Sequence, residues 1–191
     1  MEQIAHEKAA IWNSNRTEEA EGPTRKLPQV RHSRPAKPHF VKPMKATAVD
    51  RLPEGDEWIY EIKWDGYRVI AMKHGDEVRL LSLKEKNLTS DFATVAEAIN
   101  GIAADTAVID GEVVAVNAQG CPSFQALQNR ASAGRDWQIL YYAFDLLNSE
   151  GRDWTRKPLR ERKAKLRDII AGSQVRYNAE LEGRPMQSFM R

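Results

Sequence analysis

The stretch that most constrains the fold of this chain is residues 107–116, AVIDGEVVAV. It is nearly all β-branched or small, and so apolar a run is typical of a strand inside a sheet. Asp110 and Glu112 are two residues apart, so they share one face of that strand. Because an unpaired carboxylate is costly to bury, two alternatives follow. Either this end of the strand is exposed to solvent, or the two carboxylates meet a cation.

A second stretch joins a strand pattern to chemistry. Apolar and charged side chains alternate along residues 60–65, which predicts a strand. Its charged face carries Glu61, Lys63 and Asp65, roughly 6.5–7 Å apart, so one phosphate-bearing ligand could contact all three. The Asp-Gly pair that follows predicts a turn, and residues 69–72 resume the extended pattern. An ordinary hairpin with a solvated outer face is the alternative reading.

Periodicity predicts the remaining elements. Further strands are expected at 77–83, 138–147 and 174–177, and helices are expected after Thr89 or Ser90, after Ser123, and from Thr155 to Ile170 with Pro158 in the first turn. The last helix has a thin apolar seam, and the rest of its surface should be a solvated basic face that includes Arg160, Arg162, Lys163, Lys165 and Arg167.

The number of strong strands sets the fold class. Short turns join them, and there are too few helices for βαβ crossovers. We therefore expect an α+β fold of two packed, mainly antiparallel sheets, with flanking helices around Thr94, Leu127 and Lys163.

Composition limits domain number and location. The 191 residues are 41% hydrophobic with a net charge of +2, which predicts one soluble domain with tails and only local basic patches. We expect a disordered, Pro-rich basic tail at 1–38, a domain at 39–183 and an unstructured tail at 184–191. The first tail is read as plain and solvated, with a DNA-contacting arm as the alternative.

Cysteine and histidine usage narrows the function classes further. The single cysteine, Cys121, fits a reducing cytoplasm, and no apolar run approaches the ~20 residues of a membrane span. The four histidines are not at ligand spacing with each other or with the cysteine, which argues against zinc. A cytoplasmic protein without a membrane partner is expected.

Three motifs in order carry a family resemblance. Residues 61–68 (EIKWDGYR) match the family's motif with the nucleophilic lysine. The third motif matches residues 109–112 (IDGE), and the aromatic-Asp motif that follows it matches residues 142–145 (YAFD). From about Phe40 to Gly183 the chain resembles the adenylation (nucleotidyltransferase) domain of ATP-dependent DNA ligases, and it is most similar to the ligase module of bacterial multi-domain end-joining ligases. This resemblance implies a nucleotidyltransferase, ATP-grasp-like fold.

The resemblance also implies an activity. Lys63 would attack the α-phosphate of ATP and hold AMP as a phosphoramidate, with Mg²⁺ supplying positive charge. The lysyl-AMP would serve phosphodiester bond formation in nicked or broken double-stranded DNA, during repair or recombination. Adenine would be read by Glu61 and the backbone of Ile62, ribose or phosphate by Arg68, and ribose or metal by Glu112, while Phe144 would stack on the base. Taken alone, Phe144 is as well explained by core packing.

Two departures from the family pattern qualify the resemblance. Where the family has Ser-Arg-Asn-Gly, residues 82–85 read Ser-Leu-Lys-Glu, so Lys84 or Lys86 would have to replace an arginine. The family's later Glu-Gly-x-x-x-Lys and Lys-x-Lys strands and its OB-fold are not found, so a C-terminally truncated ligase is expected. A non-catalytic remnant with weak nucleotide or DNA binding is the main alternative, and an RNA-capping guanylyltransferase is disfavoured.

Overall fold

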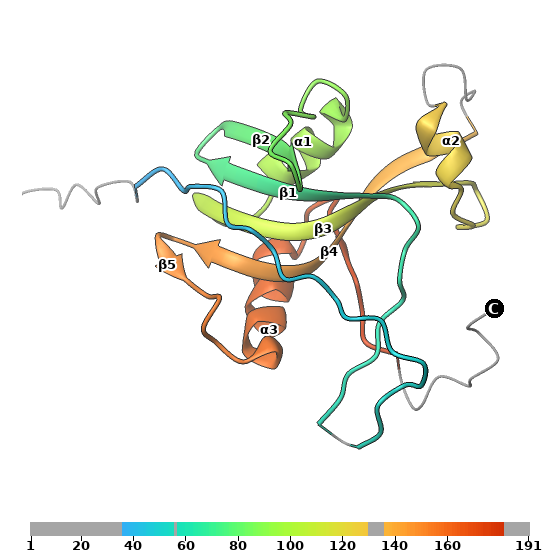
Figure 1. The fold of residues 1–191 in the computed structure, drawn as a ribbon. Helices are drawn as coiled ribbons and strands as arrows, with labels where there is room; N and C mark the ends of the chain where they lie inside the picture. The colour runs from blue at the N-terminus through green and yellow to red at the C-terminus, as the bar shows by residue number, and fades with distance from the viewer. Residues whose placement is uncertain (1–35, 56, 130–135, 182–191) are drawn as a thin grey trace, which may run out of the picture. The chain divides into compact units, whose positions relative to one another are not determined.

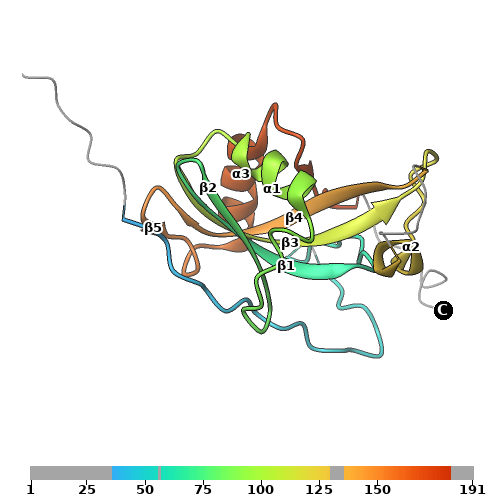
Figure 2. The same cartoon turned by 90° about the horizontal axis from the view of Figure 1, so that it is seen from above.

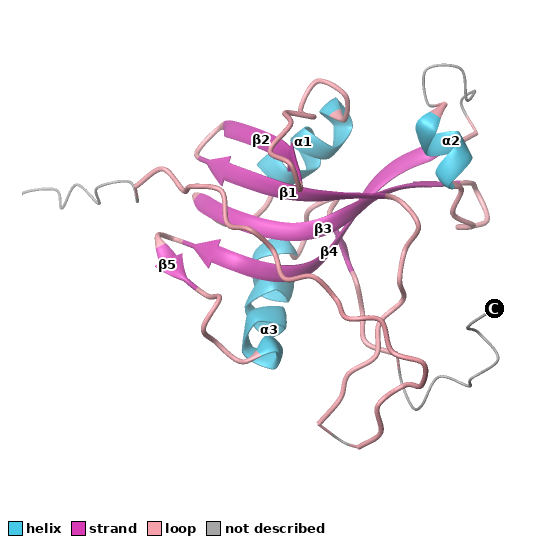
Figure 3. Ribbon diagram, viewed as in Figure 1, coloured by secondary structure: helices cyan, strands magenta, loops and turns pink. Residues whose placement is uncertain are grey.

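The computed structural model describes residues 36–55, 57–129 and 136–181, and the predicted tails fall almost entirely outside these ranges. One six-stranded sheet organises the described residues (Figures 1 and 3). Its strands are β1 (Tyr67–His74), β2 (Glu77–Ser82), β3 (Thr106–Val116), β4 (Gln138–Ser149), β5 (Arg152–Asp153) and β6 (Arg176–Tyr177). The order is β2-β1-β3-β4-β5, with β6 beside β4. Every pairing is antiparallel except that of β4 with β6.

Three helices accompany the sheet: α1 (Ala93–Asn100), α2 (Phe124–Gln128) and α3 (Leu159–Ile170). Helices α1 and α3 lie on one face, and the loop that precedes β1 runs along the other (Figure 2). The expected α+β class with mainly antiparallel strands is confirmed. The described residues form one mixed sheet, and the second sheet of the prediction is not found among them.

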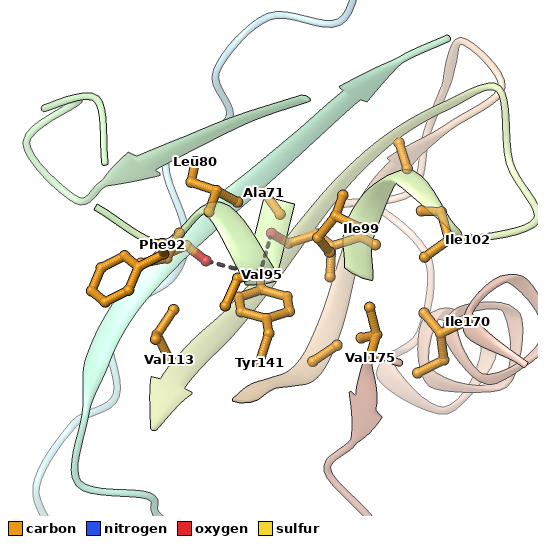
Figure 4. Close-up of a cluster of buried hydrophobic side chains, with 14 of the residues drawn as sticks. Ala71, Leu80, Phe92, Val95, Ile99, Ile102, Val113, Tyr141, Ile170 and Val175 are labelled. Carbon is orange, nitrogen blue, oxygen red and sulfur yellow. Dashed lines mark hydrogen bonds between the residues drawn. The ribbon is translucent and has the colours of Figure 1, made fainter. Parts of the chain in front are cut away.

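The main core fills the space between the sheet and the two helices. Val95 and Ile99 of α1 are fully buried in this core (Figure 4), as is Leu166 of α3. Tyr141 lies at its centre, with its hydroxyl 2.9 Å from the carbonyl oxygen of Val69 and in reach of a second carbonyl. The buried tyrosine therefore satisfies its one polar atom on the sheet backbone.

A second, smaller core covers part of the opposite face. It comprises Ile70, Met72, Leu81, Val108 and Leu147, and Phe40 and Val41 pack against it. The segment before β1 therefore shields this end of the sheet. The rest of that face carries the polar groups described below.

The predicted strand at residues 60–65 is wrong. That stretch is a loop with one isolated bridge, between Glu61 and Glu180, and the regular strand begins at Tyr67. Asp65 and Gly66 do not form the turn of a hairpin. The hairpin of this region joins β1 to β2, and its turn contains Gly75. Gly66 instead passes close to β3, where an added Cβ would lie 2.1 Å from the Val113 carbonyl oxygen. Alternation predicted a strand, but no strand of the described residues supplies the ladder that a strand needs.

Helix starts were predicted with mixed success. Ser123 caps α2 as expected, and its hydroxyl accepts a hydrogen bond from the Ala126 N–H at 3.2 Å. Helix α1 begins later than predicted, because the Thr89 hydroxyl accepts from the Leu80 N–H instead. Helix α3 also begins later, after Pro158, because Thr155 bonds to Asp153. None of the helices in the described residues is long and apolar enough to cross a membrane.

Candidate active site

A buried ion pair anchors the sheet face opposite the helices. Arg68 donates to both oxygens of Asp110, from Nε at 3.0 Å and from Nη2 at 2.6 Å. The Asp110 side chain is 3% exposed, and Nη2 also donates to the Met44 carbonyl oxygen. Of the two alternatives for the β3 carboxylates, the cation applies to Asp110, and that cation is Arg68. Burial raises the pKa of Asp110, and the guanidinium opposes this rise.

Glu112 lies directly opposite Arg68 in the β1–β3 register. It is half-buried, and this burial raises its pKa, while the Gly66 N–H and the positive charges of Lys63 and Arg68 lower it. Among the described residues, no cation lies within ion-pair distance of its carboxylate. Glu112 is therefore a carboxylate within the field of Lys63 that can still accept a cation or a hydroxyl group.

The loop that carries Lys63 is fixed on both sides of that residue. The Asn178 side chain donates to the Ile62 carbonyl oxygen at 3.3 Å and accepts from the Trp64 indole N–H at 2.9 Å. The Trp64 ring also stacks on Tyr142, with ring centroids 4.0 Å apart. The Lys63 side chain itself is exposed. A free amine on a backbone held at both neighbours suits a nucleophile that must meet a bound substrate.

Glu61 is turned toward α3 rather than toward Lys63. Its carboxylate forms an ion pair with Lys163, whose side chain is 1% exposed. The Lys163 amine also donates to the Asn178 carbonyl oxygen at 3.0 Å and lies over the Tyr177 ring. Burial raises the pKa of Glu61, and Lys163 opposes the rise. One Glu61 oxygen is thus already engaged within the protein.

The predicted solvated face of α3 is wrong at Arg162 and Lys163. Both side chains are buried, because each finds a carboxylate. Arg162 donates to both oxygens of Asp145, at 2.7 and 2.9 Å, and to the Lys157 carbonyl oxygen. Spacing within the helix could have shown this, since both residues fall within the i, i+3, i+4, i+7 stripe that begins at Leu159.

Phe144 sits at an irregularity of β4. Gly111 pairs with Ala143 and Asp110 with Asp145, so Phe144 is the extra residue of a bulge. It belongs to neither buried cluster, and the Arg68 guanidinium lies 5.4 Å from its ring centroid. Core packing does not explain this residue, and its role as a base platform stays a prediction. On the ring face that Arg68 covers, a base would have to displace the guanidinium.

The predicted site residues therefore divide into two groups. Arg68, Glu112 and Phe144 share one sheet face, and the charge of Lys63 acts on Glu112. The carboxylate of Glu61 is directed to α3. The residues that sequence reasoning did not place at the site are Trp64, Tyr142, Lys163 and Asn178. No spacing or motif singled out Asn178, because its role depends on two segments 116 residues apart.

Glu112 also bears on whether Mg²⁺ would fit. The described residues contain no group of three His, Cys, Asp or Glu side chains that could hold a metal by themselves. Mg²⁺ is usually held by one or two carboxylates together with substrate phosphates and waters. A half-buried carboxylate near an exposed lysine meets that requirement, so the residues present fit a metal that arrives with a nucleotide.

Comparison with known proteins places this site in context. The family described as ATP dependent DNA ligase domain matches residues 38–187. The multifunctional non-homologous end joining protein LigD of Pseudomonas aeruginosa is 36% identical over 151 residues, which cover 78% of this chain and 18% of that protein. DNA ligase C of Mycobacterium tuberculosis is 36% identical over 141 residues, 70% of this chain and 38% of that protein.

Solved structures agree with these matches. The ligase domain of M. tuberculosis LigD aligns with a TM-score of 0.58 at 31% identity, over 69% of this chain and 43% of that one. A mycobacterial DNA ligase D complexed with ATP and MES aligns with a TM-score of 0.57 at 30% identity, over 69% and 42%. This chain thus spans less than half the length of these relatives.

Proposed function

Because the chain belongs to the family of ATP-dependent DNA ligase domains, we propose that it carries out the adenylation step of such a ligase. Lys63 is the nucleophile and ATP is the nucleotide substrate. The observation that carries the proposal is the exposed Lys63 on a loop held at both neighbours, with its charge acting on the half-buried Glu112.

The proposed step forms one bond and breaks one. The Lys63 ammonium gives one proton to solvent, and the neutral amine attacks the α-phosphorus of ATP. The N–P bond forms with loss of a second proton to solvent while the bond to the leaving pyrophosphate breaks. A lysine amine in water is almost wholly protonated at pH 7, so the reaction needs positive charge nearby. Glu112 would hold Mg²⁺ or the ribose, and the metal supplies that field and neutralises phosphate charge.

The other site residues would bind the nucleotide. The Ile62 carbonyl and the Glu61 carboxylate are proposed acceptors for the adenine amine, since each already accepts one internal hydrogen bond and has further acceptor capacity. Arg68 would reach ribose or phosphate only by sharing its guanidinium with Asp110. Phe144 would stack on the base. The open part of this sheet face would pack on a second sheet, as the sequence predicts.

The joining of DNA ends, which would follow adenylation, is also a proposal. We extend the proposal to a cytoplasmic ligase that acts on nicked or broken double-stranded DNA in repair or recombination. A relative named for non-homologous end joining supports DNA as the substrate. DNA phosphates would be attracted by Lys and Arg side chains in a salt-dependent manner. The lysyl-AMP would supply the adenylate for phosphodiester bond formation.

The test is incubation with α-labelled ATP and Mg²⁺, followed by denaturing gel electrophoresis. We expect label on the wild-type chain and none on Lys63→Ala, because no covalent intermediate forms without the amine. Labelling by GTP rather than ATP would indicate a guanylyltransferase. No label from either nucleotide, with nucleotide binding retained, would indicate the non-catalytic alternative.

A further inference from the structure

We infer that Asn178 is a positioning residue for Lys63, an inference that rests on the proposed adenylation activity. Asn178 is 115 residues from Lys63 in sequence and does not contact a substrate in this scheme. Its side chain joins the two residues that flank the nucleophile, by accepting from Trp64 and donating to Ile62. It therefore fixes the backbone from which the Lys63 amine extends.

Asn178 is itself anchored from both sides. Its N–H donates to the Ala143 carbonyl oxygen of β4 at 2.9 Å, and its carbonyl oxygen accepts from the buried Lys163 amine of α3 at 3.0 Å. The residue is 5% exposed. Because β4 and α3 both contribute to the main core, the amide group is held by the rigid part of the domain.

The other restraints on the loop lie on either side of residues 62–65, which form no helix or strand. On one side Glu61 forms an isolated bridge with Glu180 and an ion pair with Lys163, and on the other side the Gly66 N–H donates to Glu112. The stack of Trp64 on Tyr142 fixes one ring but not the peptide before Lys63. Loss of the Asn178 amide would therefore free the Ile62 peptide and leave the indole N–H without its acceptor.

The expected consequence is a slower chemical step. Misplacement of a reacting group by about 1 Å can cost on the order of a hundredfold in rate. We expect Asn178→Ala to lower the maximal rate of lysyl-AMP formation by about 10- to 100-fold, with the half-saturating ATP concentration changed less than about threefold. Trp64→Phe keeps an aromatic ring to stack on Tyr142 and removes the indole donor together with part of the ring, while the Asn178 bond to Ile62 remains, so a smaller loss is expected.

Two comparisons separate positioning from general destabilisation. Asn117→Ala is the matched control, because the Asn117 side chain also makes two hydrogen bonds, here both as the acceptor from the N–H groups of Gln119 and Cys121, in the turn that follows β3. This control should lose stability without losing adenylation rate. Because Trp64 and Asn178 share one bond, Trp64→Phe should slow the Asn178→Ala variant less than it slows the wild type.

Hydrogen exchange of residues 60–66 provides a readout that needs no activity. We expect Asn178→Ala to exchange faster there, while the main core keeps its protection. An active wild type whose Asn178→Ala variant adenylates at the same rate would overturn the inference and leave the proposed function intact. If the wild type forms no adduct, the proposed function fails. In that case, an Asn178→Ala variant whose residues 60–66 exchange hydrogen as slowly as in the wild type would also overturn the positioning role of Asn178.

Discussion

Glu112 is subject to two opposing demands at the residue scale. Burial disfavours its charge and raises its pKa, with Asp110 adding to the rise, while the Gly66 N–H, Lys63 and Arg68 only partly offset it. A carboxylate whose pKa is higher folded than unfolded destabilises the fold while it is charged. That penalty disappears as the pH falls through the folded-state pKa. The proposed chemistry nevertheless needs the charged form.

Glu112→Gln should therefore stabilise the protein and impair its reaction. At pH 7 we expect a higher free energy of unfolding than in the wild type, because the amide avoids the cost of burying a charge and still accepts from Gly66. The difference should shrink as the pH falls, becoming constant below the unfolded-state value of about 4.3. Urea titrations at several pH values measure this. A variant less stable than the wild type at pH 7 would contradict it.

Glu85 is a second residue with a conformational conflict. Its φ is +60°, a left-handed conformation that costs an ordinary residue roughly 1 kcal/mol and suits glycine. We expect Glu85→Gly to raise the free energy of unfolding by about 0.5–1 kcal/mol. Glu150 is the matched control at φ +52°, because its carboxylate accepts from the Asp105 N–H at 2.7 Å. Glu150→Gly should bring no gain, and equal gains at both positions in chemical denaturation would refute this account.

At the scale of elements, α3 connects the core to the Lys63 loop. Lys163 is buried and pairs with Glu61, so its removal leaves a half-buried carboxylate without its cation. Breaking such a pair typically costs about 3 kcal/mol or more. We expect a loss of this size for Lys163→Met in urea denaturation. Lys165→Met, on the same helix and without a comparable partner among the described residues, should change stability by less than about 0.5 kcal/mol. Equal effects of the two substitutions would contradict the assigned role of the pair.

The success of sequence prediction differed between elements for physical reasons. Strands β1 to β4 and the cap at Ser123 followed from local pattern, because burial on a sheet leaves a two-residue period and a cap needs only its own turn. Residues 60–65 have the same alternation, yet in the part of the chain that the structure describes they make only one isolated bridge. Whether such a stretch pairs is decided by tertiary contacts that are distant in sequence.

The candidate site was predictable to a similar extent. Lys63 was indicated by the charged face of an alternating stretch and Glu112 by its place on an apolar strand, whereas the role of Arg68 came from the family resemblance. The sequence could not show which cation pairs with Asp110, since Lys63 and Arg68 were both available. The burial of Arg162 and Lys163 was obscured by their charge, although their spacing matches the buried stripe. Asn178 could be recognised only from three-dimensional contacts.

At the scale of the whole molecule, adenylation and sealing should separate. Adenylation needs a nucleotide near Lys63, whereas sealing also needs two DNA ends held in line at near-contact distance. Residues 1–191 match 43% of the solved ligase domain, so we expect these residues by themselves to become adenylated without sealing a nicked duplex. A gel assay with nicked duplex, ATP and Mg²⁺ tests this. Ligated product at stoichiometric protein would show that the matched region suffices.

The central claim is that Lys63 becomes covalently linked to AMP. Intact-mass measurement after incubation with ATP and Mg²⁺, followed by peptide mapping, tests it most directly. We predict one added AMP moiety, located on the peptide that contains Lys63, acid-labile as a phosphoramidate, and absent from Lys63→Arg. An adduct that maps to another residue, or one that persists in Lys63→Arg, would contradict the account.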